Sequence, residues 1–376
     1  MDFTVFNILI LFGCVQGFFL AFLLVRGSKF KKKYHAYLAL FIFSFSLNNL
    51  YYFSYDVGLL QKYPLLFFLP FTWGLLLPFA LLYFVEYLVN PGFKPSKKVT
   101  FWLVLPFAIH ILIEVASGVI FLVDRKWLAE HISIYNTVLE ISELVNIVLA
   151  IVILVFVLYK INRYQFDLKN NYAALTNKTL VWLRTLIIAL LVLWALWSIP
   201  YLYEIFIGSS SQAHHYPLWI GMTIVIYWIG YSTYTKGEVF EVAAFAQPVE
   251  PSKTDSTLSE KTEEHHQKLM DTMKNLKPYL NPDLNLEMLA ANVDVSAGYL
   301  SQIINKKEKV NFYDFVNRYR VEEAKNIIRN PKFRHYSLLA IGQEAGFNSK
   351  TTFNAAFKRY AGATPSQFKN EMERQL

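Results

Sequence analysis

Apolar residues fall into seven long runs within the first 235 residues of the chain, and polar residues gather between the runs and after the last one. Each run holds about 18 residues or more, enough for an α-helix to cross the hydrocarbon layer of a bilayer. Basic residues follow the first run and do not precede it, which is typical of an uncleaved anchor and not of a secretion signal. The pattern predicts membrane-spanning helices over residues 3–25, 36–55, 64–89, 99–123, 134–159, 180–207 and 215–234.

The pattern changes in the last third of the chain. Residues 236–265 mix Pro248 and Pro251 with Ser, Thr, Lys and Glu and lack apolar periodicity, which is typical of a flexible linker. An amphipathic helix is expected from His266 to Lys277, followed by two helix-turn-helix patterns whose second helices begin after the N-caps Ser296 and Ser349. One continuous helix over 312–328 is expected to connect them. The sequence therefore predicts an all-α protein with a seven-transmembrane-helix domain (1–235), a linker (236–265) and a tandem helix-turn-helix domain (266–376).

Three segments of the tail resemble the DNA-binding domain of AraC/XylS-type transcription regulators. They read LNLEMLAANVDVSAGYLSQIIN, NFYDFVNRYRVEEAKNII and LLAIGQEAGFNSKTTFNAAFKRYAGATPSQFK, and the likeness covers about residues 270–370. The sequence departs from the family pattern at Asp294, where the family usually has Gly in the first turn, and at Gly342, where it usually has Ala. The seven-helix part resembles the membrane portion fused to such domains in some bacteria.

The charges agree with this resemblance and indicate an orientation in the membrane. Residues 295–369 hold 13 Lys and Arg against 5 Asp and Glu, an excess that favours a phosphate-binding face. The loops after runs one, three and five carry 12 Lys and Arg and the other loops carry 3, which places the N-terminus outside and the tail in the cytoplasm. The resemblance implies that this membrane is the inner membrane of a bacterium. Glu86 and Arg184 then lie near the cytoplasmic ends of their runs, where an ion pair is expected.

The resemblance also implies which residues face DNA. Its base-facing positions correspond to Gly298, Ser301 and Gln302 in the first recognition helix, and to Lys350, Thr351 and Asn354 in the second. The amides of Gln302 and Asn354 can pair with adenine and the Lys350 ammonium can donate to guanine, whereas Gly298 offers no side chain. The residues expected to contact phosphates, and so to position the domain without specifying sequence, are Lys306, Lys307, Arg318, Lys358 and Arg359.

A few polar residues fall inside the apolar runs, where an unpaired polar group is costly. His110 and Glu114 are four residues apart and therefore share a helical face, and Glu140 and Glu143 follow helical spacing in the next run. Two interpretations stay open: interhelical hydrogen bonds and ion pairs that fix the bundle, or an outward-facing acidic pocket that binds a cation, an amine or a proton. The candidate signal-binding residues are His110, Glu114, Glu140, Glu143 and Glu204.

The tail has no Gly-rich phosphate loop, catalytic triad or metal-ligand spacing, and Cys14 is the single cysteine. We therefore expect no enzyme activity, no cofactor and no metal. The sequence predicts a membrane-bound one-component transcription regulator whose partners are double-stranded promoter DNA, membrane lipid, a small ligand or proton, and, as further candidates, RNA polymerase and a second copy of the chain. The alternative is a transporter-like bundle whose tail binds a partner protein. A third hypothesis is that proteolysis frees the tail from the membrane.

Overall fold

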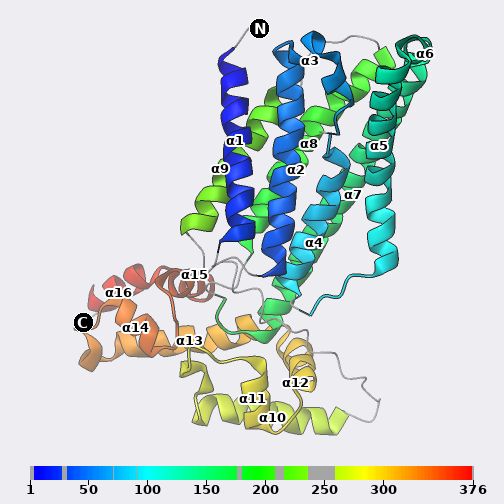
Figure 1. Ribbon diagram of the computed structural model, residues 1–376. Coiled ribbons are helices and arrows are strands. Elements are labelled where there is room, and N and C mark those ends of the chain that lie inside the picture. Colours follow the sequence, from blue (N-terminus) through cyan, green and yellow to red (C-terminus); the bar gives the residue numbers. More distant parts are fainter. Residues whose placement is uncertain are drawn as a thin grey trace. The chain divides into compact units, whose positions relative to one another are not determined.

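The computed structural model describes residues 4–27, 32–70, 72–90, 92–175, 180–207, 216–235 and 259–374. These residues form helices and, apart from one isolated antiparallel bridge between Tyr172 and Asn285, contain no β-structure, so the expected all-α class is confirmed (Figure 1). The chain divides into two compact units. The first is Met1–Ile161 with Leu180–Ala244, and the second is Asn162–Thr179 with Phe245–Leu376.

The first unit contains a helix in each of the seven apolar runs. Among the described residues, five helices are long and apolar enough to cross a bilayer, namely α1, α2, α5, α7 and α8, and two apolar stretches, Gly74–Val89 and Leu218–Ile229, are shorter. The elements are α1 (Val5–Arg26), α2 (Lys33–Asp56), α3 (Leu59–Lys62), η1 (Pro64–Phe68), η2 (Gly74–Leu76), α4 (Leu77–Val89), α5 (Lys97–Val123), α6 (Arg125–Glu130), α7 (Ile132–Asn171), α8 (Val181–Ile207) and α9 (Tyr216–Thr235).

Two of these elements differ from the expected runs. The run over 64–89 is not one helix. The short helix η1 ends at Phe68, and the next residue, Leu69, has extended backbone (φ −77°, ψ 139°). Leu69 precedes Pro70, and the proline ring disfavours helical backbone in the residue before it. Helix α7 continues to Asn171, well past the expected end at residue 159, and therefore contributes to both units.

Small residues let helices of the first unit approach closely. Helix α1 packs against α2 and α9. A Cβ atom on Gly17 would lie 2.0 Å from the Ser46 Oγ of α2, and one on Gly13 would lie 2.5 Å from Thr223 of α9. Contacts through small residues are typical of helices that associate within a membrane, where the hydrophobic effect does not drive them together.

The second unit is built around α13. Its elements besides residues 162–179 are α10 (Ser259–Asn275), η6 (Pro278–Leu280), α11 (Leu286–Val293), α12 (Ala297–Ile303), η7 (Ile304–Glu308), α13 (Phe312–Arg329), η8 (Pro331–Phe333), α14 (Leu338–Glu344), α15 (Lys350–Ala361) and α16 (Pro365–Arg374). Helix α10 begins inside the expected linker, at Ser259 and not at His266, and the linker residues up to 258 lie outside the described part of the chain.

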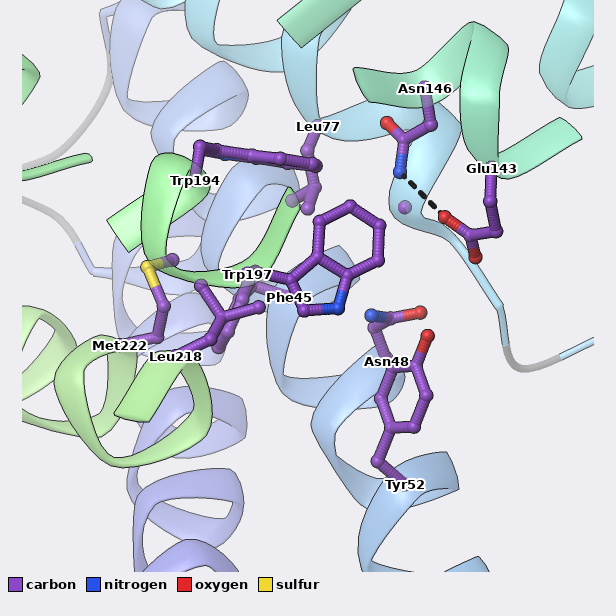
Figure 2. Close-up of a pocket in the computed structure, with 11 residues that line it drawn as sticks. Phe45, Asn48, Tyr52, Leu77, Glu143, Asn146, Trp194, Trp197, Leu218 and Met222 are labelled. Atoms are coloured by element: carbon purple, nitrogen blue, oxygen red, sulfur yellow. Dashed lines mark hydrogen bonds between the residues drawn. The ribbon is translucent and has the colours of Figure 1, made fainter. Parts of the chain in front are cut away.

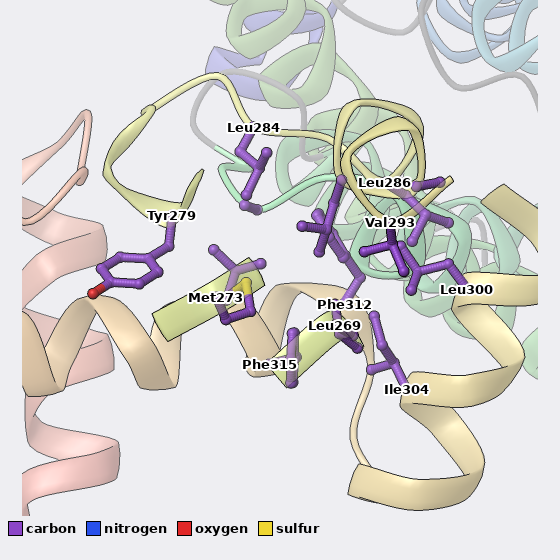
Figure 3. Packing of buried hydrophobic residues seen from close by; sticks show 14 of the residues in the cluster. Leu269, Met273, Tyr279, Leu284, Leu286, Val293, Leu300, Ile304, Phe312 and Phe315 are labelled. Atoms are coloured by element: carbon purple, nitrogen blue, oxygen red, sulfur yellow. The ribbon is translucent and has the colours of Figure 1, made fainter. Parts of the chain in front are cut away.

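The second unit has two apolar cores, one for each helix-turn-helix. The first includes Leu269 and Leu300 with Phe312 and Phe315 from the start of α13 (Figure 3). The second surrounds Phe353 of α15 and includes Val321, Ala324 and Ile327 from the later turns of α13. The continuous helix expected between the two helix-turn-helix patterns is therefore present, and it joins the two cores.

Candidate functional sites

Helices α11 and α12 form the first helix-turn-helix, and each begins at a side-chain cap. The Asn285 side chain accepts a hydrogen bond from the Met288 backbone N–H at 2.8 Å, and Ser296 Oγ accepts one from the Tyr299 N–H at 3.3 Å. Asp294 lies in the turn with left-handed backbone (φ 65°, ψ 45°). Asp is one of the few residues other than Gly that adopts this conformation readily, so the departure from the family pattern leaves the turn intact.

Helices α14 and α15 form the second helix-turn-helix. Ser349 caps α15, with its Oγ accepting from the Thr352 N–H at 3.1 Å. Gly346 in the turn has φ +89°, and a Cβ there would lie 2.3 Å from the Tyr279 carbonyl oxygen. A Cβ on Gly342 would lie 3.0 Å from the Phe353 ring. Gly342 thus lets the ring pack closely against α14, which accounts for the second departure.

The residues expected to read bases differ in exposure between the two recognition helices. Lys350, Thr351 and Asn354 are exposed on α15, and their spacing puts them on one face of the helix. Ser301 and Gln302 are half-buried on α12. Gly298 is buried within α12, so it offers DNA little surface. The second helix therefore offers the fuller set of polar side chains.

Three of the five residues expected to bind phosphates are paired with carboxylates. Lys307 pairs with Glu263, Arg318 with Glu308, and Arg359 with Asp314 at 2.9 Å. Lys306 and Lys358 are exposed, and no ion pair is found for them within the described residues. The carboxylates could not be found from helix periodicity, since they lie 10 to 45 positions away along the chain.

Glu308 is the centre of a charged network that holds α10 against η7. It accepts from His266 Nε2 at 3.0 Å and pairs with Arg318. Burial by itself would raise the pKa of Glu308, but hydrogen bonds from His266 and Arg318 outweigh burial, and the pKa is lowered. The network therefore stabilises the ionised carboxylate and fixes the position of α10 on the first helix-turn-helix.

In the first unit, His110 and Glu114 lie together, as their spacing predicts. Both are buried, and both contact Thr72: the Thr72 Oγ1 is 2.7 Å from His110 Nε2 and its hydroxyl donates to Glu114 Oε1. His110 Nε2 is 3.4 Å from the same oxygen. Within the described residues, His110 Nδ1 and Glu114 Oε2 are buried without a hydrogen-bond partner. The cluster thus joins α5 to the non-helical segment before η2, and two of its polar atoms have no hydrogen-bond partner among the described residues.

Glu143 lines a separate pocket next to Asn146 (Figure 2). The Asn146 Nδ2 donates to Glu143 Oε2 at 3.4 Å, whereas the buried Asn146 Oδ1 has no partner among the described residues. The cavity itself is small, with a volume of about 20 Å³, which is room for about one water molecule or a small ion. It is lined by Phe45, Asn48, Tyr52, Gly74, Leu77, Glu143, Asn146, Trp194, Trp197, Leu218 and Met222.

His110, Glu114 and Glu140 do not line this pocket. Glu140 is exposed, although it lies on the same helix as Glu143. The Glu204 side chain lies outside the described residues. Glu86 pairs with Lys160 of α7, which corrects the expected pairing with Arg184, since Arg184 is exposed. Among the described residues, no group of three or more His, Cys, Asp or Glu lies close enough to hold a metal ion.

The exposed surface of the first unit is apolar, as expected for a protein that lies in a lipid bilayer. Large apolar side chains are exposed along its helices, including Phe12 and Phe19 of α1, Leu112 of α5 and Val152 of α7. A soluble protein rarely exposes apolar surface of this extent. The helices that carry these side chains are among the five that are long enough to cross a bilayer.

Comparison with known proteins agrees with the geometry of the second unit. Residues 289–371 match a family described as a helix-turn-helix domain. The chain is 28% identical over 90 residues to the Msm operon regulatory protein of Streptococcus mutans (24% of this chain, 31% of that protein). It is 25% identical over 108 residues to the regulatory protein PocR of Salmonella typhimurium (29% and 35%).

A third relative is the transcriptional regulatory protein HptR of Staphylococcus aureus, 28% identical over 80 residues (21% of this chain, 30% of that protein). The chain thus spans about a third of the length of the relatives it matches. No solved structure matches the chain.

Proposed function

We propose that this chain, whose C-terminal part is an AraC-type helix-turn-helix domain, is a transcription regulator embedded in a membrane. The proposed parts are a membrane domain in residues 1–235, a linker in 236–265 and a DNA-binding domain in 266–376. The observation that carries the proposal is the capped α15, which presents Lys350, Thr351 and Asn354 on one exposed face of the matched domain. These three side chains offer the donors and acceptors that read base edges in a major groove.

The two helix-turn-helix units would bind one side of a duplex. Their recognition helices α12 and α15 pack into the two cores at opposite ends of α13 (Figure 1). Successive major grooves on one side of B-DNA are about 34 Å apart, so a single chain can occupy two of them without a partner chain. Lys306 and Lys358, exposed and without a carboxylate partner in the described residues, are the leading phosphate contacts.

The membrane domain would hold the regulator in a bacterial inner membrane, with the N-terminus outside and the C-terminus in the cytoplasm. The exposed apolar side chains and the five long apolar helices support the insertion. The 12-to-3 distribution of basic residues between alternate loops supports the orientation. DNA binding requires the same orientation, because the promoter is in the cytoplasm.

The pocket beside Glu143 and Asn146 is the proposed signal site. It joins a carboxylate to a buried amide oxygen for which the described residues supply no donor, and such a pair accepts a proton, a cation or an amine. A ligand that binds one arrangement of the lining helices better than another would shift the population toward it, and the change would reach the DNA-binding domain.

The test of the function uses the full chain in lipid nanodiscs and random genomic fragments. We expect enrichment of specific fragments, with affinity that falls steeply as salt rises. A matched chain carrying Lys350→Ala and Asn354→Ala should lose the enrichment while it keeps weak, salt-sensitive binding. If the parent chain bound no DNA at any salt concentration, the alternative of a transporter-like bundle with a protein-binding tail would replace the proposal.

A further inference from the structure

The second unit contains a segment from a distant part of the sequence. Residues 172–174 follow directly on α7, between two of the long apolar helices, yet they belong to the unit that carries the helix-turn-helix domain. Tyr172 forms an antiparallel bridge with Asn285, and the Ala173 N–H donates to the Leu284 carbonyl at 3.2 Å. Ala173 is fully buried in the first core together with Leu269 and Phe315. The segment therefore completes this core.

Two polar side chains of α13 bind the main chain of the segment. Arg320 Nη1 and Asn317 Nδ2 both donate to the Ala173 carbonyl, at 3.3 and 3.2 Å. Arg320 is fully buried, and its other donors reach the carbonyls of Tyr279 and Asn281, each at 2.8 Å. Among the described residues no carboxylate pairs with this guanidinium. A buried charge is tolerated only when its hydrogen bonds are satisfied, so the Ala173 carbonyl is part of what keeps Arg320 in the core.

The bridge between Tyr172 and Asn285 lies at the start of α11. Asn285 is the N-cap of α11, the first helix of the first helix-turn-helix. Leu284, which accepts from Ala173, is buried in the same core. The segment consequently contacts the residues that fix where α11 begins, and α11 in turn packs against recognition helix α12.

We propose that residues 172–174 are a docking segment through which α7 controls the first helix-turn-helix unit. Helix α7 carries Glu143 and Asn146 and runs without interruption from Ile132 to Asn171, so an axial shift at one end is transmitted to the segment at the other. Docking holds Leu284 and Asn285 in place, and release frees the start of α11. The segment that occupies the first core is part of the same chain, with Ala173 buried there and bonded to Leu284. Its effect on DNA rests on the proposed function, but the docking itself does not.

The test is a reversible cross-link in the full chain. Tyr172 and Asn285 are the opposed residues of the bridge, and the flanking hydrogen bond from Ala173 to Leu284 places them in the pair type whose own backbones do not exchange hydrogen bonds. The Cα atoms of such pairs lie about 4.5 Å apart, a distance that accommodates a disulfide. Tyr172→Cys with Asn285→Cys, in a Cys14→Ser background, is oxidised in native membranes and scored by thiol mass-tagging. Tyr172→Cys with Lys369→Cys, on a helix that packs on the other core, is the matched control.

We expect rapid intramolecular cross-linking of the first pair and little of the control. DNA affinity should then differ at least about fivefold between the oxidised and reduced forms, and the difference should be absent from the Cys14→Ser parent. Because Asn285→Cys also removes a helix cap, Asn317→Ala provides a second variant, which should speed hydrogen exchange at the Ala173 amide while DNA binding persists.

Each other outcome overturns a separate part of the proposal. Equal cross-linking of both pairs would show that the segment does not dock, and a cross-linked dimer would show that a second copy supplies it. Cross-linking without any change in DNA affinity would remove the regulatory role. Loss of DNA binding in the parent itself would instead overturn the proposed function and leave the docking result standing.

Discussion

Arg359 donates two hydrogen bonds to the Asp314 carboxylate, of 2.9 and 3.1 Å, and so joins recognition helix α15 to α13. The Tyr360 hydroxyl donates to the same carboxylate at 2.7 Å. Asp314 is nearly buried, whereas the Arg359 side chain is 62% exposed. The buried Asp314 carboxylate therefore anchors an arginine that still reaches the surface. A residue that was expected only to contact phosphate therefore also orients the helix that carries Lys350 and Asn354.

Replacing each partner of this pair should separate the two roles. Asp314→Asn weakens the anchor without removing a cation, so we expect a loss of about 1 to 2 kcal/mol in the free energy of unfolding and an unchanged salt dependence of DNA binding. Arg359→Ala should cause a similar loss of stability and also lower the salt slope by about one. If the salt dependence of DNA binding were unchanged in Arg359→Ala, this arginine would contribute to stability and not to phosphate binding.

Base reading and phosphate binding should respond differently to substitution. Asn354→Ala and Gln302→Ala should each cost about 1 to 3 kcal/mol at the cognate site and leave binding to random DNA nearly unchanged. Lys358→Ala, on the same helix as Asn354, should weaken binding to both and reduce the salt slope by about one. Equal losses on cognate and random DNA for Asn354→Ala would show that this residue does not face the bases.

The orientation in the membrane is open to a reporter experiment. A reporter that is active only in the cytoplasm, fused after Leu376, should be active, because the basic loops resist translocation. A reporter that is active only outside should be silent at the same position. The reverse pattern would contradict both the orientation and the DNA-binding role.

The signal site can be tested with two substitutions three residues apart. Glu143→Gln removes the charge from the pocket but keeps size and hydrogen bonding, so transcriptional output per inserted molecule should be locked or lost. Glu140→Gln is the matched control, since this carboxylate is exposed on the same helix, and it should leave the output unchanged. If Glu143→Gln lowered only membrane abundance, the pocket would have a structural role alone, and the search would move to His110 and Glu114.

The lowered pKa of Glu308 predicts a pH dependence of stability. Because the folded state holds this carboxylate ionised more strongly than the unfolded state does, its contribution is present above the ordinary glutamate pKa and is lost as pH falls through the lowered value. Glu308→Gln should therefore reduce the protease resistance of α10 near neutral pH. The difference from the parent protein should shrink as pH falls through the lowered pKa, and a constant difference would contradict the assignment.

Local signals in the sequence were sufficient for most of the helix-turn-helix domain. The caps Ser296 and Ser349 and the turn at Gly346 act within a few residues, so spacing alone predicts them. The seven apolar runs likewise predict helices, because length and composition determine whether a helix can cross a bilayer. The break at Leu69 was in principle visible from Pro70.

Pairings between distant residues could not be predicted in this way. The choice of Lys160 and not Arg184 as the partner of Glu86 depends on the rotation of α7 and α8 about their axes, which hydropathy does not fix. The same holds for Arg320 and Ala173, which are 147 positions apart. Periodicity shows that a helix face is buried, but it does not show which distant segment covers it.

The division of one helix between two cores limits how such a protein can diverge. Because α13 contributes to both cores, its length sets the separation and relative rotation of α12 and α15. Inserting one residue into an α-helix adds about 1.5 Å and turns everything beyond it by about 100°. We therefore expect related proteins to exchange the exposed residues of α12 and α15 freely as their target sequences change, while the number of residues between Phe312 and Ile327 stays constant.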